Sequence, residues 1–322
     1  MVVYGGCWWN RFSTDTTDTA ATGLSTWQIF ISRFATHKMA LISAFVLVLM
    51  SLFVFGASIM ETLFGLDPTQ VDLDHRLTTA SFTHPLGTDE LGRDLLARLL
   101  RGGQVSLIVG LSAAVISAVI GTIVGLIAGY YGGRMDGLLM RLTDGVIALP
   151  LLPLLIVLAA VDLNKLGLSE SLAQNPDIDL YRIIFIIALV GWTTVARLVR
   201  GASLSVRELD FVSAATASGA SDLRIMAIHI LPNVVTPIIV ATTLTVGNVI
   251  LLESVLSFLG LGIHPPVASW GNMLTGAQEL VWTAPMQVVY PGLAIFITVI
   301  AFNFIGDGLQ DALDPKATRT SD

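Results

Sequence analysis

The sequence predicts an all-α protein that crosses a membrane six times. Of its 322 residues, 54% are apolar and only 13% are charged, about half the charge expected of a soluble protein. The mean hydropathy is +0.77, and the apolar residues gather in six long runs. Too few charged side chains remain to cover a water-exposed surface, so the composition excludes an ordinary soluble enzyme.

The six predicted spans are residues 39–60, 105–131, 145–161, 183–199, 234–252 and 288–305. The first contains 22 residues without a charge, enough at about 1.5 Å per residue to cross a hydrocarbon layer of about 30 Å. A cleaved leader is the competing interpretation, but the long polar stretch before this run favours a retained helix. Pro150, Pro153, Pro237 and Pro291 lie within or near the spans and predict kinks that leave the helices unbroken.

Basic residues indicate the orientation. With a cytoplasmic N-terminus, 11 of the 17 Lys and Arg residues fall on the inner side, so both termini are expected inside. The group Arg93, Arg98 and Arg101 favours the opposite orientation. The predicted organisation is a cytoplasmic tail with an interfacial helix (1–38), the first span (39–60), an extracytoplasmic segment (61–104), a main transmembrane domain (105–306) with a cytoplasmic loop (200–233), and a cytoplasmic tail (307–322).

Two amphipathic helices are expected outside the spans. The first 24 residues are predicted to form a polar tail, after which Ser25 can cap a helix that carries Trp27, Phe30, Ile31 and Phe34 on one face. That face suits the membrane interface or another subunit equally well. Residues 89–101 predict a second helix on the outer surface, with Leu91, Leu95 and Leu99 on one side and Asp94 and Arg98, four residues apart, on another.

Small residues recur at every fourth position of the second span, at Ala113, Ser117, Gly121, Gly125 and Gly129. Such a ridge lets two helix backbones approach closely within lipid. It predicts a tight interface with a helix of the same chain or of a partner, although small residues are also common in membrane helices generally.

Motifs of catalysis and of nucleic-acid binding are missing from the sequence. It has no Gly-Lys pair for a phosphate-binding loop, and no two of its five histidines have the spacing of a zinc protease. Cys7 is the only cysteine, so neither an internal disulfide nor a thiolate-rich metal site can form. The net charge of −7 gives no basic surface for nucleic acid. We expect no bound metal, and any energy for uphill transport must come from another chain.

Glu253 is the only carboxylate in or next to an otherwise apolar span. It lies roughly 28 Å along the fifth span, counted from Val234, and so near its outer end. One hypothesis is that it faces a polar vestibule and helps to receive a cationic or zwitterionic solute. The alternative is a hydrogen-bonded acid that packs between helices.

The loop of residues 200–233 predicts a compact projection. Residues 207–218 have helical character, Gly219 can end that helix, and Ser221 can cap a second helix over residues 222–230 that ends at Pro232. Two short helices hinged at Gly219 would expose few charges and an apolar surface suited to a groove on a soluble partner. The residues of this predicted surface are Phe211, Ala214, Ala215, Leu223 and Ile225. An amphipathic loop that rests on lipid is the alternative.

At this loop the sequence resembles the permeases of binding-protein-dependent ABC importers, whose loop motif reads E-A-A, three residues, G, nine residues, I-x-L-P. Here Ser213, Ala214 and Ala215 precede Gly219, and residues 229–232 read HILP. Three further stretches are similar to the C-type subunit of the dipeptide/oligopeptide (and nickel) permease family: HPLGTDELGRD (84–94), LSFLGLG with the later PP and SWG (256–271), and NFIGDGLQDALDP (303–315).

The resemblance implies an ABC-importer permease fold and a heteromeric importer. A homologous B-type permease, two ABC ATPase subunits and an extracytoplasmic solute-binding protein would be its partners, membrane lipid its surroundings and peptide its substrate. ATP and Mg²⁺ would bind in the ATPases and no cofactor in this chain. The coupling loop would bring Phe211, Ser213, Ala214, Ala215, Gly219, Leu223, Ile225 and Pro232 to the ATPase. Ser213 stands where the motif has an acid. Thr216, Gln104 and Gln310 stand where the family commonly has Arg. Ion pairs from these four positions are therefore not expected.

Three alternatives to a peptide permease are another solute, a secondary carrier and an intramembrane enzyme. The same subunit role could serve nickel or another small solute. A proton-coupled secondary carrier would be expected to bury several acids or histidines in its spans, and here only Glu253 borders one. An intramembrane enzyme would need a nucleophile paired with a base, which no span provides.

Overall fold

The protein is described by a computed structural model over residues 26–161 and 176–313, with side chains from residues 31–161 and 178–313. The predicted polar tail, the cap at Ser25 and residues 314–322 lie outside the described residues. So do the side chains of Trp27 and Phe30, although their backbone belongs to the predicted amphipathic helix.

All regular elements in the described ranges are helices, which confirms the all-α prediction. In order they are α1 (Thr26–Thr36), α2 (Lys38–Phe55), α3 (Ala57–Phe64), η1 (Leu73–His75), α4 (Leu95–Tyr131), α5 (Gly133–Ala148), α6 (Leu151–Ala159), α8 (Pro176–Arg207), α9 (Asp210–Ala217), α10 (Asp222–Arg224), η3 (Ile225–Ile230), α11 (Leu231–Phe258), η4 (Asn272–Leu274), α12 (Ala277–Thr283) and α13 (Pro285–Leu313).

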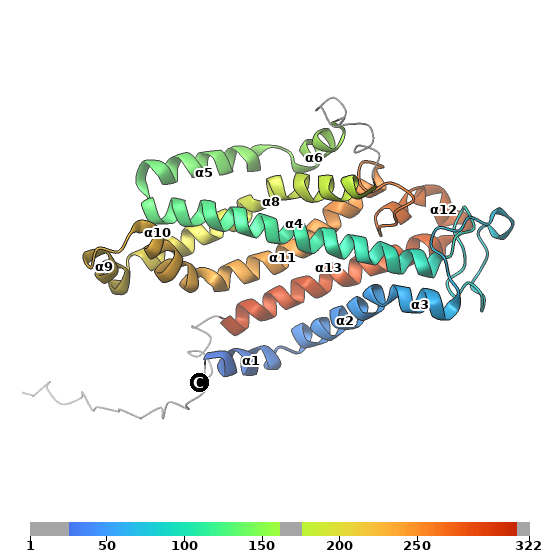
Figure 1. Ribbon diagram of the computed structural model, residues 1–322, viewed down its shortest axis with the longest axis horizontal. Coiled ribbons are helices and arrows are strands. Elements are labelled where there is room, and N and C mark those ends of the chain that lie inside the picture. The colour runs from blue at the N-terminus through green and yellow to red at the C-terminus, as the bar shows by residue number, and fades with distance from the viewer. Residues whose placement is uncertain (1–25, 162–175, 314–322) are drawn as a thin grey trace, which may run out of the picture.

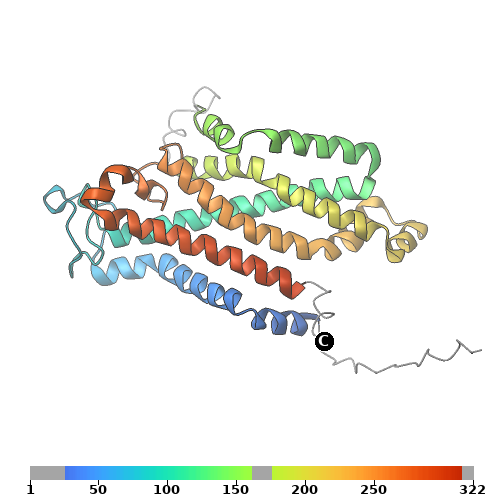
Figure 2. The same cartoon turned by 180° about the vertical axis from the view of Figure 1, so that it is seen from behind.

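The long helices run side by side in an elongated bundle (Figure 1). Helices α4, α8 and α11 lie at its centre, with α5 and α6 along one side and α13 and α2 along the other (Figures 1 and 2). Helices α9 and α10 project at one end, which we call the knob end. Helices α3 and α12 lie at the opposite end.

Five helices of the described residues are long and apolar enough to cross a membrane. They correspond to five of the six predicted spans. The remaining predicted span, residues 145–161, is wrong as a continuous helix, because α5 and α6 meet there at a bend of 84°. Proline disfavours helical backbone in the residue before it, and Leu149 before Pro150 is extended. Pro150 therefore breaks the helix instead of kinking it, and the bent pair counts as a sixth span only if taken together.

The ends of the spans also differ from the prediction. The first span stops at Phe55, and Gly56 separates it from α3. The last span continues to Leu313, beyond the expected end at residue 305. Pro237 and Pro291 lie inside α11 and α13 without ending them.

The ridge of small residues on α4 packs against α8 of the same chain. A Cβ added at Gly125 would lie 2.6 Å from the Ala196 carbonyl oxygen and 2.8 Å from the Val199 Cβ. Gly121 and Gly129 meet the Val195 Cβ and Ser203 Cβ at 2.7 and 2.5 Å in the same way. The two backbones are thus in contact, as the spacing predicts, because no side chain separates them.

Candidate functional site

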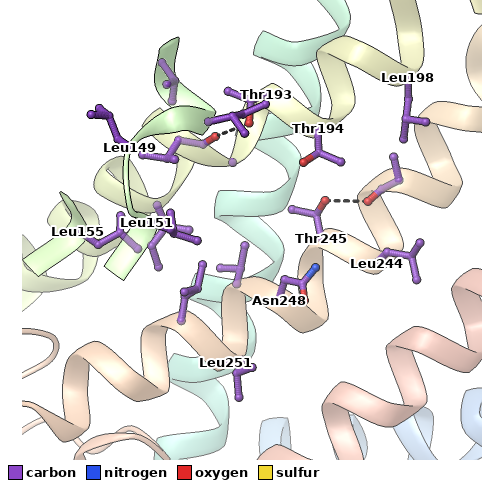
Figure 3. Close-up of a pocket in the computed structure, with 18 residues that line it drawn as sticks. Leu149, Leu151, Leu155, Thr193, Thr194, Leu198, Leu244, Thr245, Asn248 and Leu251 are labelled. Carbon is purple, nitrogen blue, oxygen red and sulfur yellow. Dashed lines mark hydrogen bonds between the residues drawn. The ribbon is translucent and has the colours of Figure 1, made fainter. Parts of the chain in front are cut away.

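A cavity with a volume of about 520 Å³ lies between α5–α6, α8 and α11 (Figure 3). The described part of its lining is mostly aliphatic and contains no charged residue. The polar side chains in it are Thr193 and Thr194 of α8 and Thr245 and Asn248 of α11. A cavity of this size with a few fixed polar groups has the composition of a small-molecule site.

Two of these polar groups are already engaged with their own helices. Thr193 donates to the Val190 carbonyl at 3.1 Å, and Thr245 donates to the Ala241 carbonyl at 2.7 Å. Thr194 and Asn248 are exposed within the described residues. Asn248 was not predicted as a site residue, although a polar amide between Gly247 and Val249 in an apolar run marks it in the sequence.

The second candidate site is the knob, residues 210–230. Helix α9 ends in a Schellman motif, in which the Gly219 N–H donates to Thr216 at 3.0 Å and the Ala220 N–H to Ala215 at 3.1 Å. Gly219 has φ = +79°, which favours glycine. This agrees with its predicted role as the stop of the first short helix.

The predicted second short helix does not end at Pro232. Residues 222–258 form one continuous helical stretch, because α10 passes through the π-helical turn η3 into α11. The Leu231 N–H donates to the Met226 carbonyl, five residues back. Proline lacks an N–H and crowds the carbonyl four residues before it; at the end of a wide π turn, Pro232 therefore begins α11 rather than terminating a helix. The knob is thus joined to the fifth span without a hinge on this side.

A small core fixes the knob to the bundle. Val212, Ile225 and Ile230 are buried together with Val199 and Val234 of the long helices. Ile225 was predicted on the exposed surface, but it is fully buried. The exposed apolar side chains of the knob are instead Leu223 and Phe211, joined by Ile228; Ser213, Ala214 and Pro232 are exposed and Ala215 is half-buried.

Polar contacts also tie the knob to the end of α4. The Tyr130 hydroxyl donates to the Asp222 carboxylate at 2.8 Å. Arg207 donates to the Gly129 and Tyr130 carbonyls at 3.3 and 3.0 Å, so that a cation caps the negative end of α4. A force on the knob therefore acts on α4 and α8 as well as on α11.

Two ion pairs attach α5 to α8 near the same end. Asp136 forms a bidentate pair with Arg200, and Asp144 pairs with Arg197 at 2.5 Å. These ion pairs therefore hold α5 against α8, even though much of the apolar surface of α5, including Leu138 and Leu142, is exposed.

Glu253 lies near the opposite end of α11 and is completely buried. Its carboxylate accepts hydrogen bonds from the Ser106 hydroxyl at 3.1 Å and the Ser257 hydroxyl at 2.7 Å. It does not line the large cavity. This geometry matches the alternative, a hydrogen-bonded acid that packs between helices.

The segment that follows α11, residues 259–274, folds back onto the bundle. Trp270 is buried and donates from Nε1 to the Leu99 carbonyl at 2.9 Å and from its backbone N–H to Ser106 at 3.2 Å. Asn272 holds the turn closed through its amide, which donates to the Ile263 and Val267 carbonyls. Ser106 thereby links this segment, α4 and Glu253 in one hydrogen-bonded group.

The loop of residues 65–94 covers the same end. Arg98 pairs with Asp89 at 3.3 Å, alongside Arg93 at 2.8 Å, and not with Asp94 four residues before it. The predicted outer helix begins only at Leu95, because Asp94 caps α4 by accepting the Ala97 N–H. In the same loop, the hydrogen bond from His75 at 2.8 Å holds the pKa of Asp72 below its usual range.

Comparison with known proteins identifies the family. Residues 121–319 match the profile described as "binding-protein-dependent transport system inner membrane component", and residues 25–79 match the "N-terminal TM domain of oligopeptide transport permease C". Over 294 residues the chain is 41% identical to the oligopeptide transport system permease protein OppC of Escherichia coli K12, covering 91% of this chain and 92% of that one.

Two further relatives have different solutes in their names. The di/tripeptide transport system permease protein DppC of Pseudomonas aeruginosa is 40% identical over 84% of this chain and 86% of its own. The glutathione transport system permease protein GsiD of Shigella flexneri is 42% identical over 90% of both chains. With spanning helices, a matching profile and relatives over nearly its whole length, the chain belongs to the family of binding-protein-dependent transport system inner membrane components, as a multi-pass permease subunit.

Proposed function

We propose that this chain is the C-type permease subunit of an ATP-driven importer of dipeptides or oligopeptides. The similarity to permeases named for oligopeptides, di/tripeptides and glutathione supports a peptide solute. A homologous permease, two ATPase subunits and an extracytoplasmic solute-binding protein complete the importer. The knob end is cytoplasmic, and both termini lie on that side.

The knob couples ATP hydrolysis to transport. The observation that carries this proposal is the unbroken helical path from Asp222 to Phe258, which the Tyr130–Asp222 hydrogen bond joins to α4. Arg207 in turn joins the end of α8 to α4. An ATPase groove that accepts Phe211, Leu223 and Ile228 would move three central helices together. Ser213 and Thr216 leave this contact dependent on shape and apolar burial rather than on ion pairs.

The test is reconstitution of the importer, purified through a tag on this chain, in liposomes with an internal ATP supply. We expect a soluble ATPase to co-purify and tripeptide uptake to require both ATP and the binding protein. Uptake by this chain alone without nucleotide would instead identify a secondary carrier. The double variant Leu223→Ser and Ile228→Ser should release the ATPase without unfolding the chain, because both side chains are exposed.

A further inference from the structure

The cavity between α5–α6, α8 and α11 contains free hydrogen-bonding groups at a depth where lipid offers none. Asn248 lies ten residues before the end of α11 at Phe258, about 15 Å from that end. This is roughly half of the hydrocarbon thickness. A primary amide that faces lipid here is costly unless it has a polar partner.

No such partner is present within the described residues. The Asn248 amide and the Thr194 hydroxyl form no hydrogen bond there, although nearby hydroxyls, such as that of Thr245, bond to their own helices. Thr245 and Asn248 are three residues apart on α11 and so share a face. Figure 3 shows them with Thr194 of α8 around the same space, surrounded by leucines.

The chemistry of these groups limits what they can bind. An asparagine amide both donates and accepts, and a threonine hydroxyl can do the same. A peptide group has one donor and one acceptor, which these two side chains can satisfy together. Among the described residues, the lining includes no carboxylate, imidazole or thiolate to hold a metal cation, and no fixed charge to select among peptide side chains.

We propose that Thr194 and Asn248 form a contact site for the backbone peptide groups of the solute as it crosses the membrane. The inference rests on the proposed function and adds a location to it. The aliphatic lining, including Leu251 and Leu198, accommodates the solute's side chains without choosing among them. The site binds the one feature that all peptides share.

The test compares Asn248→Leu with a matched change of another membrane asparagine. Asn303 on α13 is exposed, does not line the cavity, and donates to the Val299 carbonyl of its own helix. In the complete importer in liposomes, Asn248→Leu should lower the uptake of trialanine about two- to tenfold, the effect of one lost hydrogen bond. ATP hydrolysis stimulated by the loaded binding protein should be unchanged. Asn248→Gln should restore part of the uptake, and Asn303→Leu should have little effect.

The inference is overturned if Asn248→Leu transports at the normal rate, or if both leucine variants lose uptake equally. Failure of the unaltered importer to carry trialanine would refute the proposed peptide function itself. A second measurement tests whether a helix of the partner permease fills the cavity instead. With Cys7 replaced by Ser, a cysteine at position 248 should react with a hydrophilic thiosulfonate in the resting importer. Complete protection there would show that protein occupies the space.

Discussion

Substitution of Gly125 by alanine should force apart α4 and α8, the most closely packed helices of the bundle. The new Cβ would lie 2.6 Å from the Ala196 carbonyl oxygen, about 0.8 Å short of the 3.4 Å at which ordinary contacts begin. The obstructing atoms belong to backbone and to Cβ positions, which cannot rotate away. If the two helices move apart by this distance, each affected contact loses roughly a quarter to a half of its dispersion energy.

The expected packing cost is about 1–3 kcal/mol, partly hidden by a gain of about 1 kcal/mol in helix propensity. Gly201→Ala on α8 is the matched control, because no atom lies within 4 Å of its added Cβ and it gains the same propensity. Their difference therefore isolates the packing cost. Thermal unfolding of the purified chain in detergent should give Gly125→Ala an apparent Tm several degrees below that of Gly201→Ala. Equal values would refute the close approach of α4 and α8.

Three further substitutions test the knob, the α5–α8 ion pair and the Ser106 group. Gly219→Ala should destabilise the end of α9 by about 1 kcal/mol because of the positive φ alone, since the added Cβ meets no atom within 4 Å. ATPase binding should weaken in this variant and recover in Gly219→Asn; unchanged ATPase binding by the alanine variant would contradict this. Asp136→Asn should cost about 1 kcal/mol, because the half-buried Arg200 loses its bidentate partner; protease cleavage within α5 should become faster, and unchanged cleavage would count against the pair. Ser106→Ala should cost about 1–3 kcal/mol, because Glu253 loses one of its two serine donors and the Trp270 N–H loses its acceptor. Thermal unfolding against Ser205→Ala, an exposed serine on α8, measures this; similar Tm values for the two would contradict the role assigned to Ser106.

Features that depend on local pattern could be predicted from the sequence. Spans follow from apolar length, and the ridge from Ala113 to Gly129 follows from a spacing of four. The stop at Gly219 follows from the need for a residue that tolerates positive φ. Each of these signals lies within one helix, so no knowledge of neighbours was required.

Features set by distant partners could not be predicted in the same way. Glu253 was located correctly on α11, but Ser106, which lies 147 residues away, decides that its carboxyl is buried in a polar cluster. Arg98 pairs with Asp89 across a turn, not with Asp94 on the expected helical face. Pro232 was interpreted as a terminator because the π turn before it has no distinctive sequence pattern. Pro150 did carry a usable signal, since the restriction on Leu149 before it favours an extended residue.

The central claim is that a stiff helical connection carries the movement of the knob into α11. Arg224 and Ala227 lie in this connection with exposed side chains outside the proposed ATPase contact. Replacing both with glycine therefore softens the helix without removing core contacts or that contact. The decisive measurement is the ratio of trialanine imported to ATP hydrolysed by the complete importer in liposomes. The claim predicts that ATP hydrolysis persists while uptake falls several-fold; an unchanged ratio would contradict it.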